Sequence, residues 1–241
     1  MKKILIILFI SFSSVAFGQK HLVGIQGGLN FTNFTSKNGF ENTGMRTGFI
    51  GGFSYDRKLS NRYRIGLDAL YAQQGVTDKF MLTNDYGVLI GEIETKMNYD
   101  YLCMPIKIGY EIGNKAKVIP KIGIVPAISI NAESTSPTFD GNGKVIGHET
   151  VSHNDYISKF DLGGVIEIGI EEELSKNIIL CSNLNYKHSF TTFSNSNYFK
   201  GSNMRHYGFS IALGIKYRFG VTVLVIPQVI NTLCLIKLFK T

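Results

Sequence analysis

The chain has 241 residues, including 26 glycines, 17 phenylalanines, 12 tyrosines, 3 cysteines and no tryptophan. Its apolar residues, 44% of the total, can bury enough surface to offset the entropy of an ordered chain, which excludes a disordered protein. So few cysteines in a chain of this length exclude a disulfide scaffold. Frequent glycine disfavours a helical bundle, whereas tyrosine, phenylalanine, isoleucine and valine favour strands. The composition therefore predicts an all-β protein.

The first 18 residues have the features of a secretory signal peptide. Lys2 and Lys3 form its positive start, Ile4–Ile10 its apolar stretch, and Ala16–Gly18 its cleavage pattern. A retained anchor is the alternative, but the apolar run is shorter than the ~20 residues that span a bilayer. We expect cleavage before Gln19, which lowers the formal charge from +7 to +5 (23 basic minus 18 acidic). No block of like charge stands out, so no nucleic-acid partner is expected.

Next, apolar and polar residues alternate in eight segments, as in β-strands that have one apolar face. In Tyr207–Phe219 every odd position is aromatic or aliphatic and every even position is small or charged. The eight segments are Leu22–Phe31, Gly48–Tyr55, Tyr63–Gln74, Tyr101–Glu111, Val118–Ile130, Phe160–Glu171, Ile178–Phe190 and Tyr207–Phe219.

The lengths of the segments and of their connections favour a membrane barrel. Tilted transmembrane strands need ~9–11 residues. Short links alternate with long polar ones, which are Thr32–Thr47, Gly75–Asp100, Asn131–Lys159 and Thr191–His206. A soluble β-sandwich also alternates apolar and polar faces, but it does not predict this order of loops. The prediction is an eight-stranded antiparallel up-and-down transmembrane barrel with short periplasmic turns and four long extracellular loops.

In such a barrel the polar faces line the lumen, where charges must pair because they are buried. The predicted lumen network is structural and blocks conduction; it comprises Arg64, Asp68, Lys107, Glu111, Lys121, Asp161, Glu167, Glu171, Lys187, Lys216 and Arg218. Aromatic residues near the strand ends predict interfacial girdles, formed by Tyr55, Tyr63, Tyr71, Tyr110, Phe190, Tyr207, Tyr217 and Phe219.

Three stretches, His21–Phe34, Tyr99–Tyr110 with its Pro105, and Ser210–Phe219, resemble the outer-membrane β-barrel domain of Bacteroidetes, a group that includes PorT-like proteins. Glycine-rich Phe160–Ile170 resembles the sixth strand of that family. The resemblance covers about residues 20–220. It implies an outer-membrane location and a link to protein secretion for some members, but no catalytic motif.

These features together divide the chain into a signal peptide at 1–18, a barrel domain at 19–220 and an apolar extension at 221–241. Members of the family usually end at the final aromatic residue, here Phe219, whereas this chain continues with an apolar tail that Pro227 and Asn231 interrupt. Two interpretations stay open: sequence added by a frameshift, or an additional segment in the lumen or periplasm.

The sequence contains only weak motifs for metal binding or reactive thiols. His148, His153, His188 and His206 lack compact metal-ligand spacing and are expected at the surface, with no metal. Asp140–Lys144 resembles half a calcium loop, but Val151 stands where the last glutamate ligand belongs, so a turn is expected. Cys103 and Cys181 fall on polar faces of non-adjacent strands and are expected as free thiols.

The sequence thus predicts a non-enzymatic barrel without cofactors, embedded in outer-membrane lipid. Its role would be structural, or it would bind an envelope or secretion-machinery protein through the loops. The loops contain apolar residues that either bind such a partner or continue the strands: Phe80, Tyr86, Phe139, Phe193, Tyr198 and Phe199. One alternative is a small-solute transporter or pore. The other is an outer-membrane lipid-modifying or hydrolytic enzyme, with candidate loop residues Ser189, Ser194, His188, His206, Asp155 and Glu149.

Overall fold

The computed structural model describes residues 20–36, 43–83, 86–87, 89–140, 144–195 and 203–220. The expected signal peptide and the extension at 221–241 lie outside these ranges. Within them, no helix has the length and hydropathy to cross a membrane. The elements are β1 (Lys20–Thr35), β2 (Thr43–Lys58), β3 (Tyr63–Thr83), β4 (Leu89–Cys103), β5 (Ile106–Tyr110), β6 (Ala116–Phe139), β7 (Val145–Ser152), the 3-10 turn η2 (Asn154–Tyr156), β8 (Phe160–Glu173), β9 (Ile178–Ser189) and β10 (Arg205–Gly220).

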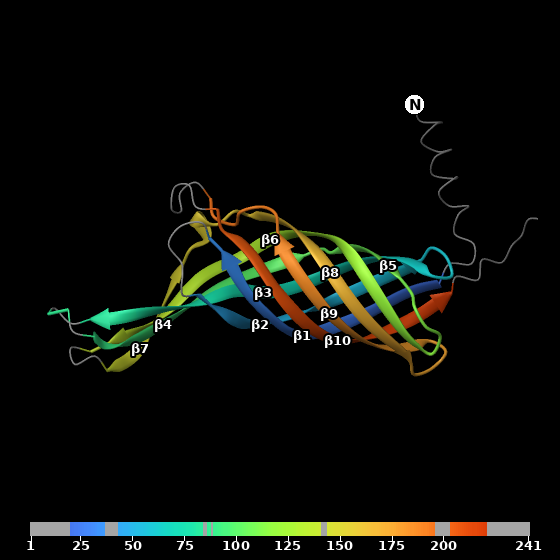
Figure 1. Cartoon of the computed structure of the whole chain (residues 1–241), viewed down its shortest axis with the longest axis horizontal. Coiled ribbons are helices and arrows are strands. Elements are labelled where there is room, and N and C mark those ends of the chain that lie inside the picture. Colours follow the sequence, from blue (N-terminus) through green and yellow to red (C-terminus); the bar gives the residue numbers. More distant parts are fainter. Residues whose placement is uncertain are drawn as a thin grey trace, which may run out of the picture.

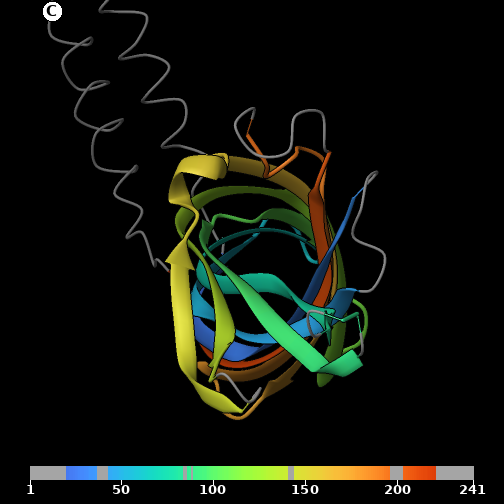
Figure 2. The same cartoon turned by 90° about the vertical axis from the view of Figure 1, so that its left-hand side faces the viewer.

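The strands form one antiparallel sheet that closes into a ring (Figures 1 and 2). The first and last strands pair along their whole lengths, from Lys20 opposite Gly220 to Thr35 opposite Arg205. Pairing of β2 with β3 completes the circuit. A closed sheet leaves no unpaired backbone edge toward lipid, which is the condition for strands in a membrane.

β4 and β5 together make one strand of the wall. Pro105 separates them, since proline has no N–H to give to the ladder. Hydrogen bonds continue across the break, because Asp68 N donates to Pro105 O (3.0 Å) and Met104 N donates to Pro126 O (2.8 Å). With β4 and β5 counted as one and β7 outside the ring, the wall has the eight predicted strands.

The distribution of side chains is the reverse of that in a water-soluble protein. Along β10, the outward residues Ile211, Leu213 and Ile215 are about half exposed, whereas the inward Lys216 is 2% exposed. The same alternation recurs on β3, β6 and β8, whose outward side chains are aliphatic or aromatic apart from a few near the strand ends, such as Glu172. An apolar outer wall around a polar interior excludes the soluble sandwich and fits a barrel surrounded by lipid.

Strands extend far into two of the predicted loops, Gly75–Asp100 and Asn131–Lys159. β3 continues to Thr83, β4 starts at Leu89, and β6 reaches Phe139 before β7 returns beside it. We call this part, formed by Thr77–Thr83, Leu89–Lys96, Ser134–Phe139 and β7, the projection; it extends past the rest of the barrel at one end (Figure 1). The alternation did not reveal it because neither face of these segments is consistently apolar.

Glycine is required where β1 and β10 approach each other. A Cβ added to the inward-facing Gly28 would overlap the carbonyl oxygen of Ile211 and lie 2.6 Å from Ala212 Cα. We expect Gly28→Ala to destabilise the barrel by roughly 1–3 kcal/mol, the usual cost of overpacking. The measurement is the fraction that keeps the fast SDS-gel mobility of a folded barrel as temperature rises.

The matched control is Gly91→Ala in the projection, where an added Cβ has no atom within 4 Å. Equal heat resistance of both variants would contradict the close approach of β1 and β10.

Candidate functional site

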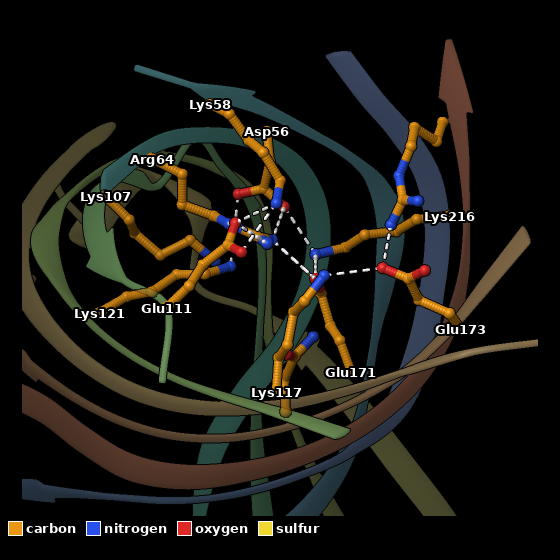
Figure 3. Close-up of polar contacts among 12 residues, drawn as sticks. Asp56, Lys58, Arg64, Lys107, Glu111, Lys117, Lys121, Glu171, Glu173 and Lys216 are labelled. Atoms are coloured by element: carbon orange, nitrogen blue, oxygen red, sulfur yellow. Dashed lines mark hydrogen bonds and ion pairs between the residues drawn. The ribbon is translucent and has the colours of Figure 1, made fainter. Parts of the chain in front are cut away.

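A continuous chain of ion pairs lies inside the ring of strands (Figure 3). Most of its residues lie within a few positions of the short turns that follow β2, β5 and β8. Arg64 pairs with Glu111 and with Glu171 (2.9 Å), and Glu171 pairs with Lys216 (2.7 Å). The chain continues through Lys216–Asp56 (2.6 Å), Asp56–Lys121 (3.4 Å), Lys121–Glu167 (2.9 Å), Glu167–Lys107 (2.6 Å) and Lys107–Asp68 (2.6 Å). Lys58 joins it at Glu111 (2.7 Å). These ten residues are the ionic cluster.

The ionic cluster is electrically balanced. It has five cations (Lys58, Arg64, Lys107, Lys121, Lys216) and five carboxylates (Asp56, Asp68, Glu111, Glu167, Glu171). Nine of the ten are buried; Lys58 is half-buried. Removing one partner from a buried pair is strongly destabilising because it leaves a charge without compensation. The cluster therefore holds the strands that contribute to it in a fixed relation.

The other three residues predicted for the lumen network lie elsewhere. Asp161 and Lys187 pair with each other (3.1 Å) nearer the outward end, where Ser189 and Thr191 donate hydrogen bonds to Asp161. Arg218 is outside the ionic cluster: it pairs with Glu173 at the periplasmic rim. Glu173 lies beyond Ile170, the last outward apolar residue of β8, and hydrogen bonds from Arg218 and Lys117 lower its pKa to about 2.

The sequence prediction missed two members of the ionic cluster, Asp56 and Lys58. The carboxylate of Asp56 contacts Lys216, Lys121 and Arg64 (3.8 Å), more cations than any other carboxylate of the cluster. The prediction ended the second strand at Tyr55 and assigned Asp56 to a turn. The alternation of the strand could have revealed Asp56, because Ser54 and Asp56 point inward whereas Phe53 and Tyr55 point outward.

Aromatic and aliphatic side chains close the outward mouth of the lumen. Phe193, from the segment after β9, is 1% exposed and stacks on His206 with ring centroids 4.0 Å apart. It also contacts Tyr99 and Phe34. Hydrogen bonds from Phe193 N to Met204 O (2.9 Å) and from Ser158 N to Phe193 O (2.7 Å) fix this segment. We call Phe34, Tyr99, Ile157, Phe193, Met204 and His206 the mouth plug.

The mouth plug corrects two expectations. His206 is fully buried, not a surface histidine, because Tyr101 and the plug surround its ring. Phe193 points inward instead of toward a partner. Of the other loop aromatics, Phe80 and Phe139 continue strands of the projection, and Tyr198 and Phe199 lie outside the described residues.

A chamber of about 60 Å³ lies between the ionic cluster and the mouth plug. Asp68, Lys107 and Glu167 of the cluster line it, together with Lys187 and the buried Gln74. A water needs ~10–15 Å³ of such space, so the chamber has room for roughly four to six waters. Apolar side chains such as Leu70, Val125 and Val165 complete its lining, so the chamber combines polar and apolar walls.

The predicted girdle residues all lie on the outer wall, at two levels. Tyr55, Tyr63, Tyr110, Tyr217 and Phe219 lie near the short turns, whereas Tyr71, Phe190 and Tyr207 lie near the mouth. Several contact one another or a histidine, as in the edge-to-face pair Tyr63–Tyr110 (5.1 Å) and the hydrogen bond between Tyr55 Oη and His21 Nδ1 (2.8 Å). The two levels bound the apolar band of the wall.

The projection exposes large apolar side chains outside that band. Met81 is 79% exposed, Ile146 66% and Leu89 58%. β7 pairs with β6 along one edge, and no other described strand pairs with it. Exposed apolar side chains in water, next to a free strand edge, are typical of surfaces that bind other proteins.

The described residues bring few nucleophiles and bases together. Ser134 Oγ and His153 Nε2 are 2.7 Å apart, but no described carboxylate pairs with His153 to orient it. Ser189 is buried and donates to Asp161, away from the His206 ring stacked on Phe193. Cys103 and Cys181 are free and buried. No group of three metal-ligating side chains occurs in the described part of the chain.

The sequence matches the family model of the outer membrane protein beta-barrel domain over residues 17–195, and the chain belongs to this family. It is an outer-membrane protein. No protein of curated function matches it.

Solved structures that resemble it include a major outer membrane protein from Thermus thermophilus (14% identity, TM-score 0.49, covering 84% of this chain and 100% of that one). OprG from Pseudomonas aeruginosa resembles it at 11% identity (TM-score 0.45; 82% and 95% covered), and the protease OmpT from Escherichia coli at 12% (TM-score 0.41; 84% and 97% covered). At these values the likenesses say nothing about what this chain binds or does.

The ionic cluster predicts a large effect of removing Lys216. Lys216→Met leaves Asp56 and Glu171 without their nearest cation, and we expect the free energy of unfolding to fall by roughly 3–5 kcal/mol. Equilibrium unfolding by urea in lipid vesicles measures it. The control Lys79→Met removes an exposed lysine paired with exposed Glu92, and we expect a far smaller change because water and salt screen such a pair. Similar losses for both variants would contradict a structural role for the cluster.

Proposed function

We propose that this protein is a non-conducting outer-membrane scaffold that holds the projection outside the cell to bind a partner protein. The observation that carries the proposal is that the lumen is closed by two separate layers while the projection leaves large apolar side chains exposed. A rigid barrel positions a binding surface well because it restricts the motion of the segments it supports.

The closed lumen argues against the transporter alternative. The ionic cluster and the mouth plug lie on either side of the chamber, so a solute would have to displace both. Breaking buried pairs and exposing aromatic side chains each costs free energy. A scaffold needs neither layer to move.

The partner belongs to the envelope or to the medium beyond it. The resemblance to PorT-like proteins makes the secretion machinery the first candidate, and an accessory role in protein secretion is the specific function that we propose to test. The free edge of β7 and its exposed Val145, Ile146 and Val151 suit an extended segment of such a partner.

The strand register supplies a clean test. Thr77 lies opposite Lys96, and Ser134 lies opposite Val151. Replacing the residues between the two members of each pair by a two-residue Asn-Gly turn therefore removes the projection without disturbing the wall. We expect this trimmed barrel to reach the outer membrane and keep its heat-dependent gel mobility. In a strain that lacks the protein, the full chain should restore the amount of secreted cargo. The trimmed barrel should leave that amount as low as in the deletion strain.

Full restoration of secretion by the trimmed barrel would show that the projection is not the functional surface. Unchanged secretion in the deletion strain would remove the secretion role. A milder variant, Met81→Ser with Ile146→Ser, changes only exposed side chains and should reproduce the defect of the trimmed barrel.

A further inference from the structure

The three periplasmic turns share a sequence pattern that the barrel fold does not explain. They read Leu59-Ser-Asn-Arg62, Ile112-Gly-Asn-Lys115 and Leu174-Ser-Lys-Asn177. Each places an aliphatic residue first and a cation two or three positions later. The aliphatic side chains are about half exposed: Leu59 49%, Ile112 53% and Leu174 60%.

Turn geometry accounts for the middle residues only. In the first and third turns the aliphatic N–H donates across the turn, from Leu59 to Tyr63 O (2.9 Å) and from Leu174 to Ile178 O (3.0 Å), and the serine hydroxyl accepts backbone N–H groups. In the second turn Gly113 takes a positive φ of 98°. Serine, glycine and asparagine are thus turn residues. Neither an exposed aliphatic side chain nor a cation is needed for the turn.

The aliphatic residues lie on the lipid-facing side of the wall. Leu59 continues the outward alternation of Phe53 and Tyr55. Ile112 extends the outward positions of β5, and Leu174 follows the exposed Glu172 on the outward face of β8. They lie beyond the periplasmic level of aromatic residues, where the apolar layer of a membrane meets its headgroups.

The cations of the three turns differ from the other cations at the periplasmic rim, which form ion pairs. Lys58, Lys117 and Arg218 each pair with a carboxylate. Arg62, Lys115 and Lys176 are exposed, and no carboxylate among the described residues pairs with them. Arg62 donates to Tyr110 Oη (2.8 Å), which directs its guanidinium along the outer wall.

We propose that the three turns bind the phosphate groups of anionic phospholipids in the periplasmic leaflet and thereby fix the depth and tilt of the barrel. At each turn the aliphatic side chain enters the edge of the acyl layer, and the cation next to it reaches the phosphate. Because the turns belong to different parts of the ring, they anchor it at three points. This inference is independent of the function of the projection.

The test compares lipid selection by the full-length protein and by the triple variant Arg62→Gln, Lys115→Gln and Lys176→Gln. Both are reconstituted in phosphatidylcholine bilayers, and association of spin-labelled phosphatidylglycerol is measured relative to spin-labelled phosphatidylcholine. A cation near an anionic surface contributes about 1 kcal/mol, so we expect roughly fivefold selection at each turn at low salt. The selection should disappear in the variant and at high salt.

The matched control removes three exposed lysines at the far end of the molecule, Lys79→Gln and Lys96→Gln in the projection and Lys144→Gln directly before β7. It should select phosphatidylglycerol as strongly as the unmodified protein. A second variant, Leu59→Ser with Ile112→Ser and Leu174→Ser, keeps the cations and should also weaken selection, because the turns no longer settle in the interface. Heat-dependent gel mobility verifies that every variant folds.

Equal selection by the unmodified protein and the glutamine variant would overturn the proposal, as would a loss of the same size in the projection control. If lipid selection is unchanged but crosslinks to a periplasmic protein are lost in cells, the turns bind a protein and the lipid proposal is wrong.

Discussion

The compensation of buried charge is the constraint on which the rest of this structure depends. A chain that places Arg64, Lys107 and Lys216 inside a narrow lumen must also supply carboxylates at hydrogen-bonding distance, since each unpaired ion would cost several kcal/mol. The carboxylates come from β2, β3, β8 and the residue after β5. Pairs such as Lys121–Glu167 join neighbouring strands, whereas Arg64–Glu171 joins strands that are not adjacent in the sheet. Closure of the ring therefore completes the charge compensation that pairs between neighbouring strands begin.

The two ends of the lumen are filled by different kinds of side chain. The ionic cluster occupies the lumen near the periplasmic turns, where the connections are short and no loop is available to fill space. At the other end the connections are long, and Phe193 and Met204 fold back to close the mouth with apolar side chains. Between these layers only a small chamber remains. The strands that continue outward as the projection are consequently supported by a wall that is packed inside.

Much of the architecture could be predicted from alternation, because one face of every wall strand meets lipid and the other meets a crowded polar lumen. Along Tyr207–Phe219 this contrast leaves no ambiguity. The projection escaped prediction since water lies on both sides of it, and Thr, Ser and Glu then occupy both faces. Asp56 was missed through an error in a strand end, the least reliable part of such a reading.

The inward position of Phe193 and His206 could not be found from sequence in the same way. Their burial depends on hydrogen bonds between segments distant in the chain, such as the one from Ser158 to Phe193, and no local pattern encodes that contact. Nor could the sequence divide the predicted lumen charges into a connected cluster, the separate Asp161–Lys187 pair and Arg218 at the rim. Those distinctions depend on where each charged side chain lies along the barrel axis, and only the strand register determines that position.

The central claim is that two packed layers close the lumen, and the conductance of single barrels in a planar lipid bilayer tests it most directly. Insertion is verified by recovering protein with folded gel mobility from the same membranes. The account predicts that the inserted protein gives no steady current steps at either polarity. Reproducible steps of constant size from the unmodified protein would show an open path through the lumen and would contradict the account.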